Sequence, residues 1–213
     1  MSETGLSGPI PDVGNMASLS RFAASDNALS GAIPQSIGNL GALLELNLAG
    51  NALSGAIPES ITSLINLQTL QLQRNRLTGE IPLNIGDLFN LQFLILHTQF
   101  DETSGEGGLT GALPASIGNL VSLQRMELYT NFLEGALPAE IGNCVSLTYL
   151  DIEFNSFSGD LPASLGDLAS LEQFYMSGNN FSGAVPTDIC AIEPLNFLVA
   201  DCALTCECCS SCN

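Results

Sequence analysis

The chain has 213 residues and carries 22 acidic side chains against four arginines and no lysine, for a formal net charge of −18. Such a charge repels phosphate backbones, so we exclude nucleic acid as a partner. No apolar run approaches the roughly 18 residues that a membrane-spanning helix requires, so we expect no membrane insertion within this chain.

A short phrase, Leu/Phe-x-Gly-x-hydrophobic-Pro, recurs eight times. Successive copies begin 23, 24, 24, 32, 24, 24 and 24 residues apart, and eight of the ten prolines occupy the last position of the phrase. Self-similarity at such a period is typical of tandem repeats, so we predict one solenoid rather than two globular domains. The copies begin at Leu6, Leu29, Leu53, Leu77, Leu109, Leu133, Phe157 and Phe181.

Residues 40–64 represent one repeat. The alternation of apolar and polar residues around Leu46 predicts a short strand with one buried face. Asn51 recurs at a fixed offset after most strands, where a buried amide can satisfy backbone groups at the turn, so we interpret it as structural. Its counterparts are Asn27, Asn75, Asn131, Asn155 and Asn179. Gly55 then permits a tight bend, Pro58 fixes φ, and a short helical turn returns the chain to the next strand.

No single repeat can bury its apolar side alone, so neighbouring repeats must stack. The predicted fold is therefore an α/β solenoid. Its strands form a concave parallel sheet of about eight strands, and short helical or 3-10 turns cover the convex side.

The repeat unit resembles the plant-type leucine-rich repeat. The clearest copy is Leu67-Gln-Thr-Leu70-Gln-Leu72-Gln-Arg-Asn75-Arg-Leu77-Thr-Gly79-Glu-Ile81-Pro82. The family includes ectodomains of receptor-like kinases and receptor-like proteins, and polygalacturonase-inhibiting proteins. The resemblance implies a right-handed coil, a second run of short strands at the Gly-x-Ile-Pro segments, and a function in binding without a cofactor.

The start of the chain departs from this pattern, because it enters in the middle of a repeat at residues 5–8. Members of the family usually begin with a cysteine-bearing cap that covers the apolar edge of the first coil. We therefore expect upstream sequence that supplies the cap and a signal or membrane anchor. We divide the chain itself into a repeat array over residues 1–189 and a cysteine-rich cap over residues 190–213.

A second departure is the 32-residue step in the middle of the array. Gln99 replaces the expected asparagine, and the insertion at about residues 99–108 is rich in glycine, serine and acids, so we predict a surface loop. Such a loop can carry recognition or be a tolerated insertion, and both interpretations stay open. Its candidate residues are Phe100, Asp101, Glu102 and Glu106, which lack the oxygen spacing of a calcium loop.

The third departure is the cysteine-rich end. An even set of six cysteines predicts three disulfides and an oxidising compartment, whereas four of them could instead hold zinc. The tail resembles the ends of leucine-rich-repeat proteins of microalgae such as diatoms, and exported relatives carry a disulfide cap, so we favour disulfides. The seventh cysteine, Cys144, is predicted to be a buried thiol. The six candidates are Cys190, Cys202, Cys206, Cys208, Cys209 and Cys212.

Strand alternation identifies the side chains of the concave face. All three tyrosines and the single histidine fall on the outward positions of the fourth to seventh strands, and aromatic residues contribute strongly to binding at interfaces. We therefore predict the ligand-binding residues to be Phe93, Ile95, His97, Arg125, Glu127, Tyr129, Tyr149, Asp151, Glu153 and Tyr175.

Catalysis has little support from these residues. His97 has no nucleophile at the outward positions of its own strand. Glu127, Asp151 and Glu153 form a carboxylate cluster of the kind that a glycosidase uses, but they lie on an open sheet. We predict a non-enzymatic recognition module of a receptor-like extracellular or cell-surface protein, which binds a protein, peptide or glycan. A secreted inhibitor of a cell-wall-degrading enzyme and a structural or adhesive cell-surface protein are the alternatives. A single glycosylation sequon at Asn180 fits export.

Overall fold

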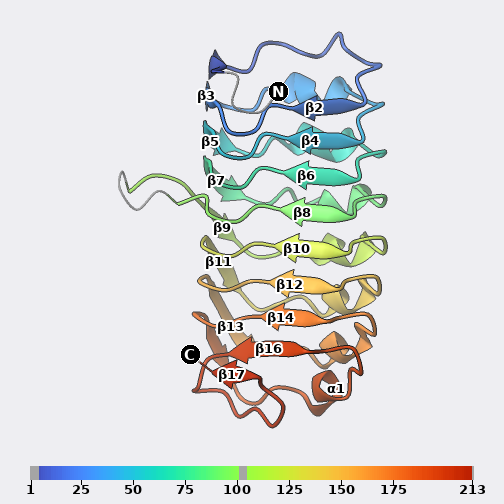
Figure 1. Ribbon diagram of the computed structural model, residues 1–213, viewed down its shortest axis with the longest axis vertical. Helices are drawn as coiled ribbons and strands as arrows, with labels where there is room; N and C mark the ends of the chain where they lie inside the picture. Colours follow the sequence, from blue (N-terminus) through green and yellow to red (C-terminus); the bar gives the residue numbers. More distant parts are fainter. Residues whose placement is uncertain (1–4, 101–104, 213) are drawn as a thin grey trace.

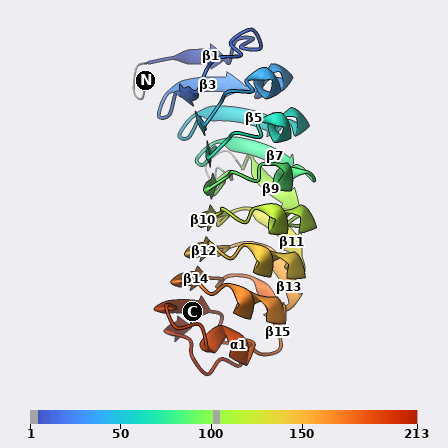
Figure 2. The same ribbon diagram turned by 90° about the vertical axis from the view of Figure 1, so that its right-hand side faces the viewer.

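The computed structural model describes residues 5–100 and 105–212. The chain winds into a solenoid whose coils are stacked one above the other along the long axis (Figures 1 and 2). Within the described residues, no helix reaches the length and apolar character of a membrane-spanning segment.

The main sheet has nine parallel strands in the described part of the chain, one from each successive coil and a last one from the C-terminal tail. Equivalent residues lie side by side, so that Met126 is next to Leu94 on one neighbour and Leu150 on the other. The first eight strands confirm the predicted sheet. In spatial order the strands are β2 (Arg21–Ala23), β4 (Glu45–Asn47), β6 (Thr69–Gln71), β8 (Phe93–Ile95), β10 (Arg125–Glu127), β12 (Tyr149–Asp151), β14 (Gln173–Tyr175), β16 (Phe197–Ala200) and β17 (Ser211–Cys212).

A second parallel sheet runs beside the first, as the family resemblance implies. The glycine of the repeated phrase lies two residues after the Leu or Phe of each copy. All eight of these glycines have φ between 75° and 84°. This left-handed conformation is accessible to glycine at little cost, which explains why the phrase requires it. The strands are β1 (Ser7–Pro9), β3 (Ala28–Gly31), β5 (Ala52–Ala56), β7 (Arg76–Glu80), β9 (Gly108–Gly111), β11 (Phe132–Gly135), β13 (Ser156–Asp160) and β15 (Asn180–Ser182).

Short helical segments cover the convex side, and most of them begin directly after the proline of the phrase. A glycine inside these segments allows adjacent coils to approach closely: a Cβ on Gly118 would lie 2.4 Å from the carbonyl oxygen of Glu140. In the second segment Thr62 takes this glycine position, and the next segment is only three residues long. The segments are η1 (Gln35–Asn39), η2 (Glu59–Ser63), η3 (Ile85–Asp87), η4 (Ala115–Asn119), η5 (Ala139–Asn143), η6 (Ala163–Asp167) and α1 (Thr187–Cys190).

The asparagine ladder links the coils to one another. The Nδ2 of Asn75 donates to the carbonyl oxygens of Leu48 and Leu72 at 2.9 and 2.8 Å, and its Oδ1 accepts from the N–H of Leu53 at 3.0 Å. Gln99 makes the corresponding contacts in the coil that lacks the asparagine. These hydrogen bonds confirm the structural interpretation of the ladder.

Candidate ligand-binding face

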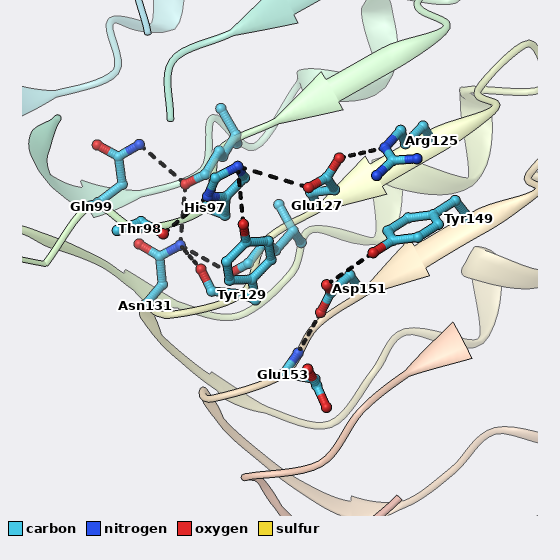
Figure 3. A network of polar contacts seen from close by, with 12 residues as sticks. His97, Thr98, Gln99, Arg125, Glu127, Tyr129, Asn131, Tyr149, Asp151 and Glu153 are labelled. Atoms are coloured by element: carbon cyan, nitrogen blue, oxygen red, sulfur yellow. Dashed lines mark hydrogen bonds and ion pairs between the residues drawn. The ribbon is translucent and has the colours of Figure 1, made fainter. Parts of the chain in front are cut away.

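The predicted binding residues lie on four neighbouring strands of the main sheet, β8 to β14, and on the turns that follow them. Parallel pairing in register aligns their side chains in rows across the strands. Figure 3 shows that most of them contact one another, so this face carries a connected network of aromatic and charged groups.

His97 and Tyr129 form one end of the network. Their rings stack with centroids 4.1 Å apart, and the Tyr129 hydroxyl lies 3.3 Å from the histidine Nε2 (Figure 3). The other ring nitrogen lies 3.0 Å from the hydroxyl of Thr98. Burial lowers the pKa of His97 to about 4, with Arg74 and Arg125 adding to the effect and Glu127 opposing it, so this imidazole is neutral at pH 7.

Arg125 and Glu127 occupy the centre of the network. Their side chains form an ion pair, and the same guanidinium lies 3.7 Å above the centroid of the Tyr149 ring. The Glu127 carboxylate also lies 3.7 Å from the His97 Nε2. Because Arg125 is held from two sides, its planar group is fixed before any ligand arrives.

Asp151 forms the acidic part of the network. It accepts hydrogen bonds from the Tyr149 hydroxyl at 3.3 Å and from the backbone N–H of Glu153 at 3.2 Å. Burial raises the pKa of Asp151 to about 7, and the charges of Glu153 and Glu127 raise it further, while the two hydrogen bonds oppose the shift. This carboxyl is therefore partly protonated near neutral pH.

The other end of the network is a second aromatic pair. The rings of Tyr149 and Tyr175 have centroids 5.6 Å apart and are tilted by 40°. The Tyr175 hydroxyl donates to Gln173, and Ser177 donates to the carboxylate of Glu153. The hydroxyls of Tyr149, Tyr175 and Ser177 therefore each have a partner within the face.

The exposure of the predicted binding residues divides them into buried residues, which support the face, and accessible residues, which a partner can reach. The relative exposure of Ile95 is 5%, that of Asp151 is 7% and that of Glu127 is 9%. These three were predicted as contact residues because alternation places them outward, but in the structure they are buried. Arg125 pairs with Glu127, and Tyr149 bonds to Asp151, each from two residues away on the same strand. The accessible members of the predicted set are half-buried: Phe93, His97, Arg125, Tyr129, Tyr149, Glu153 and Tyr175.

The described part of the insertion packs back onto the second sheet. Phe100 contacts Phe132 edge to face, with ring centroids 4.9 Å apart, and Glu106 pairs with Arg76 at 3.2 Å. Asp101 and Glu102, which were also predicted as recognition residues, lie outside the described residues. Arg76 and its neighbour Arg74 were not predicted as site residues, and the presence of two of four arginines beside the insertion is a signal that could have identified them.

The cysteine-rich end is joined by disulfides. One connects Cys190 with Cys208 and another connects Cys206 with Cys209, and Cys202 is also disulfide-bonded. The side chain of Cys212 lies outside the described part of the structure. Because three of the four sulfurs of the zinc alternative are in disulfides, they do not offer the thiolates that zinc requires.

Two further predicted positions lie away from this face. Cys144 is a buried free thiol that donates to the carbonyl oxygen of Ile117, and burial raises its pKa to about 11. Asn180, the sequon residue, is exposed on β15. In the described ranges no three His, Cys, Asp or Glu side chains gather closely enough to hold a metal ion.

The pKa of Asp151 predicts a pH dependence of stability. Because the folded pKa lies above the ordinary value of 3.8, the fold favours the protonated carboxyl. Its contribution to stability is complete below about pH 4 and is lost as pH rises through about 7. We expect Asp151→Asn to raise the free energy of unfolding relative to wild type by on the order of 1–3 kcal/mol at pH 8, with no gain at pH 4.

Urea unfolding of both proteins between pH 4 and pH 8 measures this difference. His97 has the opposite sign, since its lowered pKa gives stability that is lost as pH falls through about 4, but it contributes equally to both proteins. Asp167→Asn, at an exposed position, is the control. Parallel curves for Asp151→Asn and wild type would contradict the prediction.

Comparison with known proteins places this architecture among repeat proteins. A family model described as Leucine Rich Repeat matches residues 42–64, 66–88, 146–168 and 170–192. A comparison with curated protein sequences gives no significant match.

Several solved structures are similar over most of the chain. The plant peptide hormone receptor RGFR1 in complex with RGF2 is 35% identical with a TM-score of 0.85, and the match covers 92% of this chain and 30% of that one. The ectodomain of the Arabidopsis receptor kinase HAESA, in complex with an N-terminally extended IDA peptide hormone, is 34% identical with a TM-score of 0.81 and coverages of 91% and 31%. A plant ice-binding protein is 27% identical with a TM-score of 0.59 and coverages of 97% and 70%. The chain thus spans about a third of the receptor structures.

Proposed function

Because this chain is a leucine-rich-repeat protein of the plant type, we propose that it is the recognition part of an extracellular receptor-like protein and binds a peptide across β8–β14. The observation that carries the proposal is the connected network on this face. Receptor ectodomains of the same fold, of which this chain covers about a third, have been solved with peptide hormones bound.

The network supports binding because it is preorganised. Tyr129, Tyr149 and Tyr175 are each held by a ring contact and a hydrogen bond, so little side-chain entropy is lost when a ligand covers them. Tyrosines in such positions offer apolar area together with a hydroxyl, which suits alternating contacts to a peptide backbone and its side chains. The face thus combines rigidity with mixed chemistry.

The shape of the face favours an extended ligand over a small molecule. Four depressions of the described structure, on the convex side, at the first coil and on the flank, are lined by residues other than the tyrosines. A peptide laid across several strands can gain affinity by covering area without a deep pocket.

Charge favours a basic ligand. The chain carries a net charge of −18, and Glu153 is half-buried on the face, with Asp151 beneath it. The field accelerates association with cations and weakens as salt screens it. We therefore expect peptides with lysine or arginine to be preferred.

Selection from a random peptide display library on the immobilised full chain tests the proposal. We expect enriched basic peptides whose affinity falls at least tenfold for Tyr149→Ala and Tyr175→Ala, because aromatic residues at the centre of an interface contribute on the order of 2 kcal/mol or more. Gln71→Ala, on β6 of the same face, is the matched control and should leave affinity unchanged. Peptides that bind all four proteins equally would refute the assignment of the site.

A second candidate function is ice binding, favoured by one feature of the second sheet. Seven of its eight repeats carry a hydroxyl residue directly before the phrase glycine, so hydroxyl groups recur at the same position of the cycle in nearly every coil. A plant ice-binding protein matches nearly the whole chain. The hydroxyl residues are Ser7, Ser30, Ser54, Thr78, Thr110, Ser158 and Ser182.

Inhibition of ice recrystallisation separates the two candidates. If ice binding is the function, Ser54→Tyr with Thr78→Tyr should abolish the inhibition, whereas Tyr149→Ala should not change it. Absence of inhibition by the wild-type chain would eliminate this candidate.

A further inference from the structure

A polar depression of about 310 Å³ lies where three successive coils pass from the main sheet to the second sheet. Arg74 and Arg76 both line it, together with Thr98 and Phe100. The chain has only four arginines and no lysine, so half of its basic side chains meet at this one place. Two like charges at one depression repel each other unless an anion lies between them.

The two arginines differ in their partners. Among the described residues, Arg21, Arg76 and Arg125 each pair with a carboxylate, whereas Arg74 forms no ion pair. In a chain with 22 acidic residues, an exposed arginine without a carboxylate partner is available to an external anion.

The backbone at Arg74 is strained. Its φ is 57°, in the left-handed region that costs an ordinary residue about 1–2 kcal/mol. The same left-handed conformation recurs at the equivalent position of each coil from Asp26 to Gly178, and five of these seven residues are not glycine. It is therefore part of the turn geometry of the repeat, and in this coil the turn carries a guanidinium beside the depression.

The insertion supplies an internal anion. The Oε2 of Glu106 lies 3.2 Å from the Nη1 of Arg76, and their side chains are 63% and 40% exposed. An exposed ion pair is worth only about 0.2–1 kcal/mol, so an external anion can displace this carboxylate. Phe100 closes one wall of the depression and is fixed by its contact with Phe132.

We propose that this depression is a binding site for an oxyanion, a carboxylate, phosphate or sulfate, carried by a partner, and that Glu106 competes with it intramolecularly. Arg74 and Arg76 hold the anion by charge-assisted hydrogen bonds, and Thr98 contributes a hydroxyl to the lining. The site adjoins the His97–Tyr129 end of the proposed peptide-binding face, since Thr98 contacts His97, but no tyrosine lines it. Anion binding by the two arginines goes beyond the proposed peptide-binding function.

Titration of the arginine Nε–Hε signals tests this site directly in the 15N-labelled full chain. Four arginines give four signals, which single Arg→Gln variants assign. The probes are sodium phosphate, sodium sulfate and sodium acetate, each at constant ionic strength. We expect the Arg74 and Arg76 signals to shift along saturating curves, while Arg21, on β2, serves as the control within the same spectrum and does not saturate.

Two variants give the sharpest readouts. Glu106→Gln should move the midpoint of the Arg76 curve to about threefold lower anion concentration, because the internal competitor is neutralised. Arg74→Gln should remove saturation at Arg76. Backbone amide spectra check that both variants, changed at exposed positions, remain folded.

The choice of anion distinguishes the source of the ligand. If acetate saturates the Arg74 and Arg76 shifts as phosphate and sulfate do, the natural anion is a carboxylate of the partner. If only phosphate or sulfate saturates them, the natural anion is a phosphate or sulfate group attached to the partner. Linear shifts of all four signals, or an Arg76 curve unchanged in Arg74→Gln, would overturn the proposal. Because no peptide is present in the titration, such a failure would leave the proposed function intact.

Discussion

Replacing Asn131 by alanine is expected to lower the free energy of unfolding by about 3–5 kcal/mol, the upper range for single substitutions. Its Oδ1 accepts from the N–H of Leu109 at 2.9 Å, and its Nδ2 donates to the carbonyl oxygens of Leu96 and Leu128 at 3.2 and 2.9 Å. Alanine leaves these buried backbone groups without partners, and each such group costs about 1–3 kcal/mol.

Thermal and urea unfolding of the variant measure this loss. Asn143→Ala is the matched control, because the same side chain is removed from an exposed position at the end of η5. Asn131→Gln should be tolerated much better than Asn131→Ala, since Gln99 already fills a ladder position. Equal stabilities for Asn131→Ala and Asn143→Ala would show that the ladder is not needed for stability.

Removal of the disulfide between Cys190 and Cys208 is expected to have the second largest effect. The bond closes a segment of 18 residues, for which the loss of chain entropy in the unfolded state predicts about 3 kcal/mol. The paired variant Cys190→Ser with Cys208→Ser should therefore unfold at lower urea concentration than wild type. The loss should begin in the last coil, because the bond connects α1 with the cysteine-rich tail.

The second disulfide provides the comparison. Cys206 and Cys209 are only three residues apart, so the same relation predicts about 1.5 kcal/mol for Cys206→Ser with Cys209→Ser. Hydrogen exchange in β16 reports opening of the last coil in both variants. If the two paired variants lose the same stability, or neither loses any, the entropic explanation of the cap is wrong.

The regular part of the fold could be predicted because a single unit is copied. The positions of Leu46 and Asn51 within a 24-residue cycle imply a buried strand face and a ladder, and both are present. The strand β17 was not predicted, because its pairing with β16 lies in the cysteine-rich tail rather than in the repeats. A local pattern cannot reveal which cysteines meet.

The candidate site could be predicted only in part, because alternation gives direction but not burial. Asp151 and Ile95 lie at outward positions as expected, yet both are buried. Burial depends on side-chain rotamers, such as the one that brings the Tyr149 hydroxyl to Asp151, and alternation does not specify them. Arg74 was missed for a different reason, since it lies in the turn after β6 and not at one of the outward strand positions.

The asparagine ladder has a consequence for the evolution and engineering of this array. Each ladder amide bonds to its own coil and to the coil before it, and it always uses the same positions within the cycle. Excising or duplicating one whole 24-residue cycle therefore joins two compatible surfaces and leaves no ladder group without a partner. The length of the solenoid, and with it the reach of its concave face, can change in whole-coil steps without redesign of the remaining coils.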